Sequence, residues 1–510
     1  MHRNRLTLAV AVATATAALP QFATAQRPNP KALVQQALAA MGGETIAAAA
    51  AVRTTGVMHE YMLGNAERAE GPWRVFYSRI NELRPTAGGR LRRTAIVLGP
   101  AANSPERVTV LTDSVVTTKA GSTEAPLPPM FHDDLASYVE MQPDRALQLA
   151  MAASAVQLEA PVSRYGVMHD VVSLPWSGRR MAIELSRETH LPDAVEVRGE
   201  FAHDFRRAPF GDVRLRAEYV NWTAEAGKVW WPYQYRLSLD GEPLRDITIG
   251  SVALEGGAPA DSFAVSDSLR TLYAISAASS PPSFKFGSRG GPQELRDGII
   301  RMRDYWMMTA VRQDDGIVLV EAHLTGHYLG EVIDYLKTKY PTLPVKAIVM
   351  TSDPWAHVGG VREAVARGIP IYVNERSIPF LTRVVKSSHA SNPDRLATSP
   401  RTPRFIPVSR KLTLGSGDNR IELYPVAGAY SERMVMAYFP AHKLLYGSDL
   451  VFADRQQKGY FRTPAIELRR AVAREGLAVD SLFCVQATPM IAWSDFVPVG
   501  GLEAGVAAGK

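Results

Sequence analysis

Hydrophobic and polar residues alternate along the first half of the chain with the two-residue period of β-strands. In VRLRAEY (213–219), the odd-numbered positions are apolar or aromatic and the residues between them are charged. YQYRLSLDGEP and LRDITIGSVAL continue this alternation on either side of Asp240 and Gly241. An Asp-Gly pair between alternating runs is a strong signal for a β-hairpin. Residues 52–270 therefore predict a mostly antiparallel sheet with one wet face and one face that needs a cover.

Two further patterns complete the first half. The stretch MAIELSRETHLPDAVEVRGEF (181–201) predicts another strand pair that turns at His190-Leu-Pro-Asp. KALVQQALAAM (31–41) has helical spacing, and Gly42 and Gly43 follow it. Glycine just after a periodic segment is a typical helix end, so a short amphipathic helix is predicted to precede the sheet.

The pattern changes in the second half. GIVLVEA (316–322), VKAIVM (345–350) and IPIYVN (369–374) are apolar runs of strand length, and they alternate with the helical patterns GEVIDYLKTKY (330–340) and GVREAVARG (360–368). This order is typical of a layered α/β domain. NRIELYPV, RMVMAYFP and HKLLYGSDL suggest further strands.

A segment rich in Ser, Pro and Gly separates these two patterns. It runs from 274 to 293, lacks periodicity and is predicted to be an interdomain linker. The predicted division is residues 1–25 as a signal peptide, 27–273 as an antiparallel β-rich domain, and 294–510 as an α/β domain.

The signal peptide is predicted from the first residues. MHRNR is basic, LTLAVAVATATAALP is apolar, and ATA before Gln26 is a small-residue cleavage site. This layout is typical of a secretory signal, so the mature protein is expected to be exported, periplasmic or secreted. No later stretch is long and apolar enough for a transmembrane helix, and a membrane anchor at the start remains the alternative.

Charge and cysteine content narrow the function classes. Removal of Arg3 and Arg5 lowers the formal net charge from +6 to +4, and no basic cluster is interleaved with aromatic residues. Nucleic-acid binding is therefore not expected. The single Cys484 cannot form an internal disulfide, and its setting in LFCV favours a buried, inert thiol.

From about residue 290 the chain resembles the metallo-β-lactamase fold superfamily. DDGIVLVEA, VIDYLKTKYPTLPVKAIVMT, HVGGVREAVARGIPIYVN and AYFPAHKLLYGSDL carry the likeness, in that order. The resemblance implies an αβ/βα sandwich of two sheets with flanking helices, so the whole chain is expected to be a two-domain α+β protein. It also implies one or two zinc or related ions, whose bound hydroxide hydrolyses amides, esters, thioesters or phosphodiesters.

The ligand positions implied by the resemblance are mostly substituted. The family pattern His-x-His-x-Asp-His, the two later histidines and the bridging aspartate fall on Ser352, Pro354, Ala356, His357, Tyr430, Asp449 and Gln486. Pro354 and Ala356 have no donor atom in their side chains, and hydroxyl and amide oxygens are poor zinc ligands. A catalytic zinc needs about three good ligands and one open position. We therefore expect no metal, no catalytic residues and a vestigial pocket.

Three replacement arrangements remain open. His323 and His327 are four residues apart, the spacing at which two histidines share a helix face, although a loop would leave them bonded locally or solvated. Asp353 could join them, or it could be a turn residue before Pro354. His357 and Asp449 could be ligands, or a helix-entry residue and a cap. A metal-free Ser352–His357–Asp449 relay would need the serine about 3 Å from the imidazole and an oxyanion hole.

The N-terminal region is loosely similar to the curved-sheet domains of lipoprotein carriers, which shelter acyl chains. PYQYRLSLDGEPLRDITIGSV carries this likeness, and Trp230, Trp231, Tyr233 and Tyr235 could line a pocket or be ordinary strand residues. The leading hypothesis is an exported, non-catalytic pseudo-hydrolase that binds a small molecule or an envelope component. The alternatives are a hydrolase with a rearranged metal site, which would use zinc, and an amphiphile carrier.

Overall fold

The computed structural model describes residues 28–64, 71–98, 105–204, 206–225, 229–259, 261–280, 282, 284–288, 290–304, 306–454, 459–486 and 489–501. The predicted signal peptide (1–25) lies outside these residues. In the described part of the chain, no helix combines the length and hydropathy needed to cross a bilayer.

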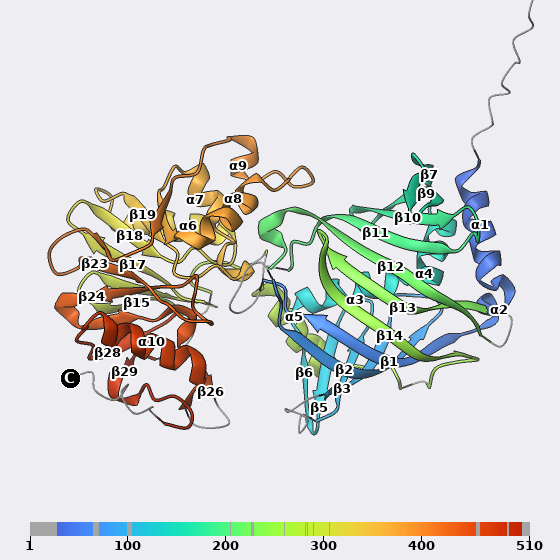
Figure 1. Cartoon of the computed structure of the whole chain (residues 1–510), viewed down its shortest axis with the longest axis horizontal. Helices are drawn as coiled ribbons and strands as arrows, with labels where there is room; N and C mark the ends of the chain where they lie inside the picture. The colour runs from blue at the N-terminus through green and yellow to red at the C-terminus, as the bar shows by residue number, and fades with distance from the viewer. Residues whose placement is uncertain are drawn as a thin grey trace, which may run out of the picture.

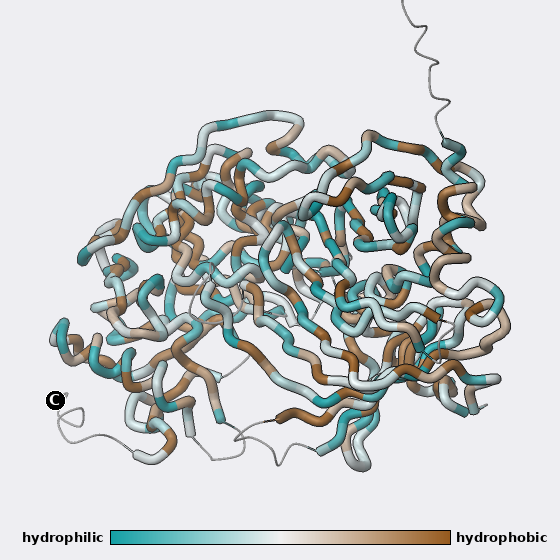
Figure 2. Tube along the Cα trace, turned by 45° about the vertical axis from the view of Figure 1, so that its right-hand side comes forward, coloured by the Kyte–Doolittle hydropathy of each residue, from teal (hydrophilic) through white to brown (hydrophobic). Residues whose placement is uncertain are grey.

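The first half forms one large antiparallel sheet, as its alternating pattern predicts (Figure 1). Figure 2 shows hydrophobic residues alternating with polar ones along its strands. Its strands are β1 (Ala51–Tyr61), β2 (Val75–Pro85), β3 (Leu91–Leu98), β4 (Arg107–Leu111), β5 (Val116–Ala120), β6 (Thr123–Pro126), β7 (Gln157–Leu158), β8 (Val162–Arg164), β9 (Val167–Trp176), β10 (Arg179–Ser186), β11 (Pro192–Glu200), β12 (Asp212–Glu225), β13 (Val229–Leu239) and β14 (Glu242–Glu255).

Local turn chemistry sets the strand register. The predicted Asp-Gly hairpin joins β13 and β14, and Asp240 and Gly241 both have positive φ angles, 50° and 94°. These angles suit the two-residue turn that matches the twist of the flanking strands. The predicted turn near His190 likewise joins β10 and β11. β1 pairs with β14, which brings the two ends of the sequence segment together in the middle of the sheet.

Helices cover the apolar face of this sheet. α1 (Pro30–Met41) ends at Gly42, whose φ of 115° is left-handed, as the sequence predicts. α2 (Gly43–Ala48) follows, and α3 (Pro129–Glu140) and α4 (Pro143–Ala152) come from the middle of the segment. Buried residues of α1, α3 and α4 share one hydrophobic cluster with the inward residues of the strands.

The predicted linker is partly regular. α5 (Asp267–Ala278) extends into its first residues and β15 begins at Gly291, and the described residues between these two elements lie in neither a helix nor a strand. The predicted linker therefore overlaps the end of α5 and the start of β15. Ser266 caps α5 by accepting a hydrogen bond from the N–H of Leu269, which explains a helix in this polar sequence.

The second half contains two packed sheets and flanking helices. The seven-stranded sheet consists of β15 (Gly291–Arg296), β16 (Ile299–Arg303), β17 (Met308–Gln313), β18 (Gly316–Val320), β19 (Val345–Val349), β20 (Ile371–Asn374) and β21 (Phe405–Val408). The six-stranded sheet consists of β22 (Leu412–Leu414), β23 (Ile421–Pro425), β24 (Val435–Phe439), β25 (Leu444–Tyr446), β28 (Ser481–Phe483) and β29 (Ile491–Ala492), and β26 (Ala453–Asp454) pairs with β27 (Gly459–Tyr460) separately.

The buried clusters reveal the layering of this half. One cluster lies between the two sheets and includes Val318 and Val349 from the first and Val435 and Phe483 from the second. α10 (Arg462–Arg474) packs on the outer face of the second sheet. α6 (Gly326–Lys339), α7 (Val361–Ala366), α8 (Ile378–Lys386) and α9 (Arg395–Thr398) lie on the side of the first sheet. This multi-sheet α+β architecture agrees with the predicted helix–sheet–sheet–helix order.

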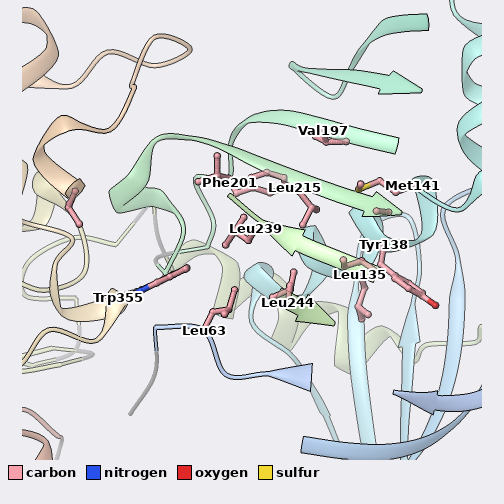
Figure 3. Packing of buried hydrophobic residues seen from close by; sticks show 14 of the residues in the cluster. Leu63, Leu135, Tyr138, Met141, Val197, Phe201, Leu215, Leu239, Leu244 and Trp355 are labelled. Atoms are coloured by element: carbon pink, nitrogen blue, oxygen red, sulfur yellow. The ribbon is translucent and has the colours of Figure 1, made fainter. Parts of the chain in front are cut away.

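The apolar core is continuous across the predicted domain boundary at Trp355. Its indole, only 5% exposed, belongs to the same cluster as the N-terminal core and points toward Leu63 (Figure 3). The ring centroid of Trp355 lies 4.8 Å from that of Phe210 and 6.2 Å from that of Trp73. The backbone N–H of Trp355 donates to the Gly64 carbonyl at 2.7 Å. Gly64 is required here, because a Cβ atom would lie 1.8 Å from the indole.

Candidate functional site

The structure brings several of the predicted pocket residues into one buried polar cluster. Glu321 follows β18, Ser352 follows β19, and Asp449 follows β25, so the ends of three strands converge there. His357 ends the short 3-10 helix η2 (Trp355–His357). Each of these four residues is at most 4% exposed, which places the cluster beneath the surface. We call Glu321, His323, Ser352, His357 and Asp449 the polar cluster below.

His357 is the centre of this cluster. Its Nε2 lies 3.1 Å from Asp449 Oδ2, and its Nδ1 lies 3.1 Å from Ser352 Oγ and 3.6 Å from Glu321 Oε2. Ser352 Oγ is also 3.1 Å from Asp449 Oδ2. With both ring nitrogens protonated, His357 donates to Ser352 and forms an ion pair with Asp449, and the Ser352 hydroxyl donates to Asp449. The three residues therefore form a closed ring of two hydrogen bonds and one ion pair.

The charges of the cluster decide its protonation state. Burial lowers the pKa of His357, but the neighbouring Asp449 and Glu321 carboxylates outweigh burial and raise it to about 9. His357 is therefore an imidazolium at neutral pH. Burial raises the pKa of Asp449, partly offset by His357. The pKa of Glu321 is lowered, because its contacts with His357 and Thr351 outweigh the raising effect of burial.

Hydroxyl groups of Thr351 and Tyr446 hold Glu321 in place. Thr351 Oγ1 donates to Glu321 Oε1, and the Tyr446 hydroxyl donates to the same oxygen at 3.2 Å. Thr351 Oγ1 also lies 2.6 Å from Ser448 Oγ. Glu321 and Ser448 have positive φ angles of 77° and 50°, a conformation that is unfavourable for both residue types. The surrounding structure therefore imposes the backbone conformations of Glu321 and Ser448, which both contact Thr351.

His323 and His327 separate, so the i, i+4 helix-face hypothesis was wrong. His323 precedes α6 and His327 lies in its first turn, where it is largely exposed and 3.3 Å from Glu331. His323 is fully buried between Trp306 and Tyr328, and its ring centroid is 6.1 Å from that of His357. Burial lowers the pKa of His323 to about 4, so it is neutral.

Asp353 is not a simple turn residue. It is buried and paired with Arg433, whose Nε and Nη2 lie 2.8 and 2.5 Å from Asp353 Oδ2. Arg433 approaches the Phe380 ring at 5.9 Å. Ser352 and His357 lie in the same loop as Asp353. The Asp353–Arg433 pair therefore anchors this loop to the side of the sandwich that contains β24.

The other predicted pocket positions lie in different surroundings. Pro354 begins η2 and Ala356 accepts a hydrogen bond from the Leu324 N–H at 3.2 Å. Tyr430 packs against the apolar cluster beside α10. Gln486 does reach the cluster, because its side chain hydrogen-bonds Asp449 and lowers the pKa of that residue.

The described residues do not fit a catalytic zinc ion in this arrangement. A histidine ligand needs an unprotonated ring nitrogen, whereas both nitrogens of His357 are engaged with Ser352 and Asp449. Among the described residues, no group of three or more His, Cys, Asp or Glu side chains has the geometry to hold a metal ion. However, Glu321 Oε2, Asp449 Oδ1 and both ring nitrogens of His323 are buried without a hydrogen bond of normal geometry, although the Trp306 backbone weakly favours a proton on His323.

The distances within the polar cluster can be compared with those that a metal-free Ser352–His357–Asp449 relay requires. Ser352 lies within the required distance of His357, which sequence alone could not establish. A general base must be neutral, however, and His357 is protonated at neutral pH. Ser352 donates its proton to Asp449 and is 1% exposed, so a substrate carbonyl has no route to it. The arrangement is a closed ring of two hydrogen bonds and one ion pair and does not activate the serine.

The aromatic residues of the N-terminal sheet belong to a closed core. Trp231 and Tyr235 are at most 1% exposed, and the indole N–H donates to the tyrosine hydroxyl at 2.7 Å. Trp230 is 43% exposed on the other face. Arg84 joins the sheet to α4 through Asp144 at 2.5 Å.

Sequence reasoning missed Glu321, Thr351, Tyr446, Trp306 and Arg433. Glu321 left a signal, because a glutamate directly after five apolar strand residues is an unusual place for a charge. Trp306 lies over His357 with ring centroids 5.3 Å apart. Nothing in the local sequence of Tyr446 or Arg433 distinguishes them from ordinary strand-end residues.

Comparison with known proteins finds structural neighbours of more than one kind. No family model matches the chain, and no curated protein matches it. A metallo-beta-lactamase from Pontibacter korlensis is 19% identical, covers 40% of this chain and 94% of its own, and has a TM-score of 0.32. The sec-alkylsulfatase Pisa1 from Pseudomonas sp. is 16% identical over 40% of this chain and 39% of its own, with a TM-score of 0.29. A putative outer membrane lipoprotein-sorting protein domain from Vibrio parahaemolyticus is 12% identical over 46% of this chain and 95% of its own, with a TM-score of 0.31.

Proposed function

We propose that this chain is an exported, non-catalytic binding or assembly protein whose C-terminal half retains the shell of a metallohydrolase. The observation that carries the proposal is the closed ring of Ser352, His357 and Asp449. In this ring His357 is an imidazolium. Its positive charge lies among the side chains that would otherwise surround a metal ion.

The packing of the loop supports the same function. Trp355 lies between Pro354 and Ala356, and it anchors the loop to the N-terminal half through Gly64 and Phe210. A loop that is buried in this way holds two parts of the protein together.

Metal analysis of protein purified without a His tag tests the proposal. We expect well under half an equivalent of zinc, iron or manganese per chain, because His357 must lose a proton before it can bind a cation. Assays for β-lactam and ester hydrolysis should show only background rates. More than about half an equivalent of metal, lost in the His357→Gln and Asp449→Asn variants, would overturn the proposal.

A hydrolase with a rearranged metal site is the second candidate, and one observation favours it. With Glu321 and Asp449 ionised and His357 protonated, the polar cluster has one excess negative charge, and Glu321 Oε2, Asp449 Oδ1 and His323 retain unused ligand atoms. A divalent cation would compensate that charge. Loss of bound metal in a His323→Ala variant would identify this second arrangement, because the ring of Ser352, His357 and Asp449 does not include His323.

A further inference from the structure

A basic pocket lies between α8 and α9, among the helices beside the seven-stranded sheet (Figure 1). Its volume is about 460 Å³, within the range of roughly 300–1,000 Å³ that is typical of small-molecule sites. Its wall comes from Arg362 of α7, the second half of α8, α9, and residues 400–403 before β21. None of the described residues that line it is acidic. The pocket is therefore a candidate site for an anion.

Arg362 builds the inner wall of this pocket and is fully used for structure. Its Nε and Nη2 donate to the two carboxylate oxygens of Asp394 at 2.5 and 2.9 Å. Its Nη1 donates to the Val385 carbonyl at 2.6 Å, in the last turn of α8. The last carbonyls of a helix have no partner within the helix, so Arg362 satisfies this end of α8. Lys386, the next residue, is therefore not needed for that purpose.

Arg401 likewise is not needed to cap α7. Its Nη1 passes close to Gly368, where a Cβ atom would lie 2.5 Å from it. Three carbonyls in the last turn of α7 already accept the backbone N–H groups of Arg367, Gly368 and Ile369, at 3.0, 2.9 and 3.0 Å. The absence of a side chain at Gly368 therefore lets Arg401 reach the pocket wall over the end of this helix.

Lys386 and Arg401 give the pocket two positive charges. Within the part of the chain that the structure describes, no carboxylate lies within ion-pair distance of Lys386 Nζ or the Arg401 guanidinium. Residues 383–411 contain seven Lys or Arg and one acidic residue, Asp394, whose carboxylate Arg362 already holds. The field of this segment therefore favours an anion in the pocket.

A second pocket, which shares Arg362 with the first, shows the opposite balance. It measures about 510 Å³ and lies where the residues near Pro209 meet α6 and α7. Two of its arginines pair with carboxylates of the same wall: Arg362 with Asp394 at 2.5 Å, and Arg367 with Glu363 at 2.7 Å. The excess of positive charge is therefore a local feature of the pocket between α8 and α9.

We propose that the pocket between α8 and α9 binds an organic phosphate monoester. Such a group carries close to two negative charges at neutral pH, which match the charges of Lys386 and Arg401. The planar guanidinium of Arg401 can donate to two phosphate oxygens, and Lys386 supplies a point charge. Val385 and Leu396 offer apolar surface to the organic group. The polar cluster contributes no residue to this pocket, so the proposal is independent of metal binding there.

Calorimetric titration of the full chain with phenyl phosphate tests this site, at about pH 8, where the phosphate is fully ionised. We expect saturable binding that weakens by at least about tenfold in Arg401→Gln and in Lys386→Gln, because each variant removes a charge-assisted hydrogen bond. Both residues are exposed, so the variants should fold. Arg410→Gln changes an exposed arginine of the same basic segment outside the pocket, and it should bind phenyl phosphate like the wild type.

Two further probes separate the charge from the organic group. Phenyl sulfate has nearly the same shape but one negative charge, and inorganic phosphate has no ring, so each should bind several-fold more weakly than phenyl phosphate. Equal affinity of the wild type and either pocket variant for phenyl phosphate would overturn the proposal. So would phenyl sulfate or inorganic phosphate binding as tightly as phenyl phosphate, or no saturation by phenyl phosphate up to about 10 mM.

Discussion

Both halves of the chain bury charged side chains, but with different partners. In the N-terminal half, Arg245 and Arg207 pair with Asp134 of α3, and Arg84 pairs with Asp144 of α4. In the C-terminal half, His357 takes the cationic role between Asp449 and Glu321. Arginine stays charged throughout the accessible pH range, whereas histidine titrates within it.

The ion pairs of the N-terminal half are therefore a permanent clamp, meaning that they keep their charges at every accessible pH. The ion pairs of His357 are conditional, because they depend on its protonation. Burial raises the pKa of Asp134, but Arg245 and Arg207 outweigh it and hold that pKa far below its usual value. The pairs that fasten α3 and α4 to the sheet should therefore be insensitive to pH near neutrality. The cluster around His357 should not be, because the proton on its imidazole is what holds its two carboxylates together.

The largest expected effect is the loss of a permanent pair. Asp134→Asn removes the buried carboxylate that Arg245 and Arg207 share and leaves them with Glu60 and Asp204, so the free energy of unfolding should fall by about 3–5 kcal/mol. The neighbouring Asp133→Asn should cost less than about 1 kcal/mol, because Asp133 is more exposed and contacts His203 at the surface. Urea denaturation measures both. Equal losses in the two variants would show that the buried pair is not a clamp.

A similar but somewhat smaller loss is expected at the junction of the two halves. Trp355→Ala removes the indole from its contacts with Phe210 and Trp73, and large buried aromatics cost about 3–5 kcal/mol when truncated. The low end is expected here because Trp355 lies at the edge of the core. Trp230→Ala is the control, since Trp230 is 43% exposed and should cost little.

Separate unfolding of the two halves in Trp355→Ala, seen as two transitions where the wild type has one, would sharpen the comparison. It would show that this residue couples the N-terminal clamp to the C-terminal cluster. A variant as stable as the wild type would contradict the role assigned to the loop.

The smallest of the three effects is a pH dependence of stability from His357. Its pKa is about 9 in the folded protein and about 6.5 when unfolded, so its contribution is fully present below pH 6.5 and is lost as pH rises through 9. The shift corresponds to at most about 3 kcal/mol. Urea denaturation between pH 6.5 and 9.5 should show this decline.

The His357→Gln variant should flatten that decline, because glutamine does not titrate. His327→Gln, which changes an exposed histidine on α6, should leave the decline as in the wild type. A wild-type stability that is constant over this pH range would show that His357 is not held as an imidazolium by its carboxylates.

The sequence by itself determined the elements and their order. Alternation in β12 and β13, the Asp240-Gly241 turn and the glycine end of α1 are local signals, since each depends on residues a few positions apart. The substitution of the metal-ligand positions stays a prediction, because it rests on the resemblance. α5 was not predicted, although its Ser266 cap is also a local signal.

Only the tertiary structure decided what the remaining polar residues do. Ser352 and Asp449 are 97 positions apart in the chain, and Glu321 meets them only because three strand ends converge. His323 enters the cluster and His327 does not, although the two are equally close to it in sequence. The reason is physical: the protonation of His357 depends on the distances to charges brought by other strands, and no local pattern encodes those distances.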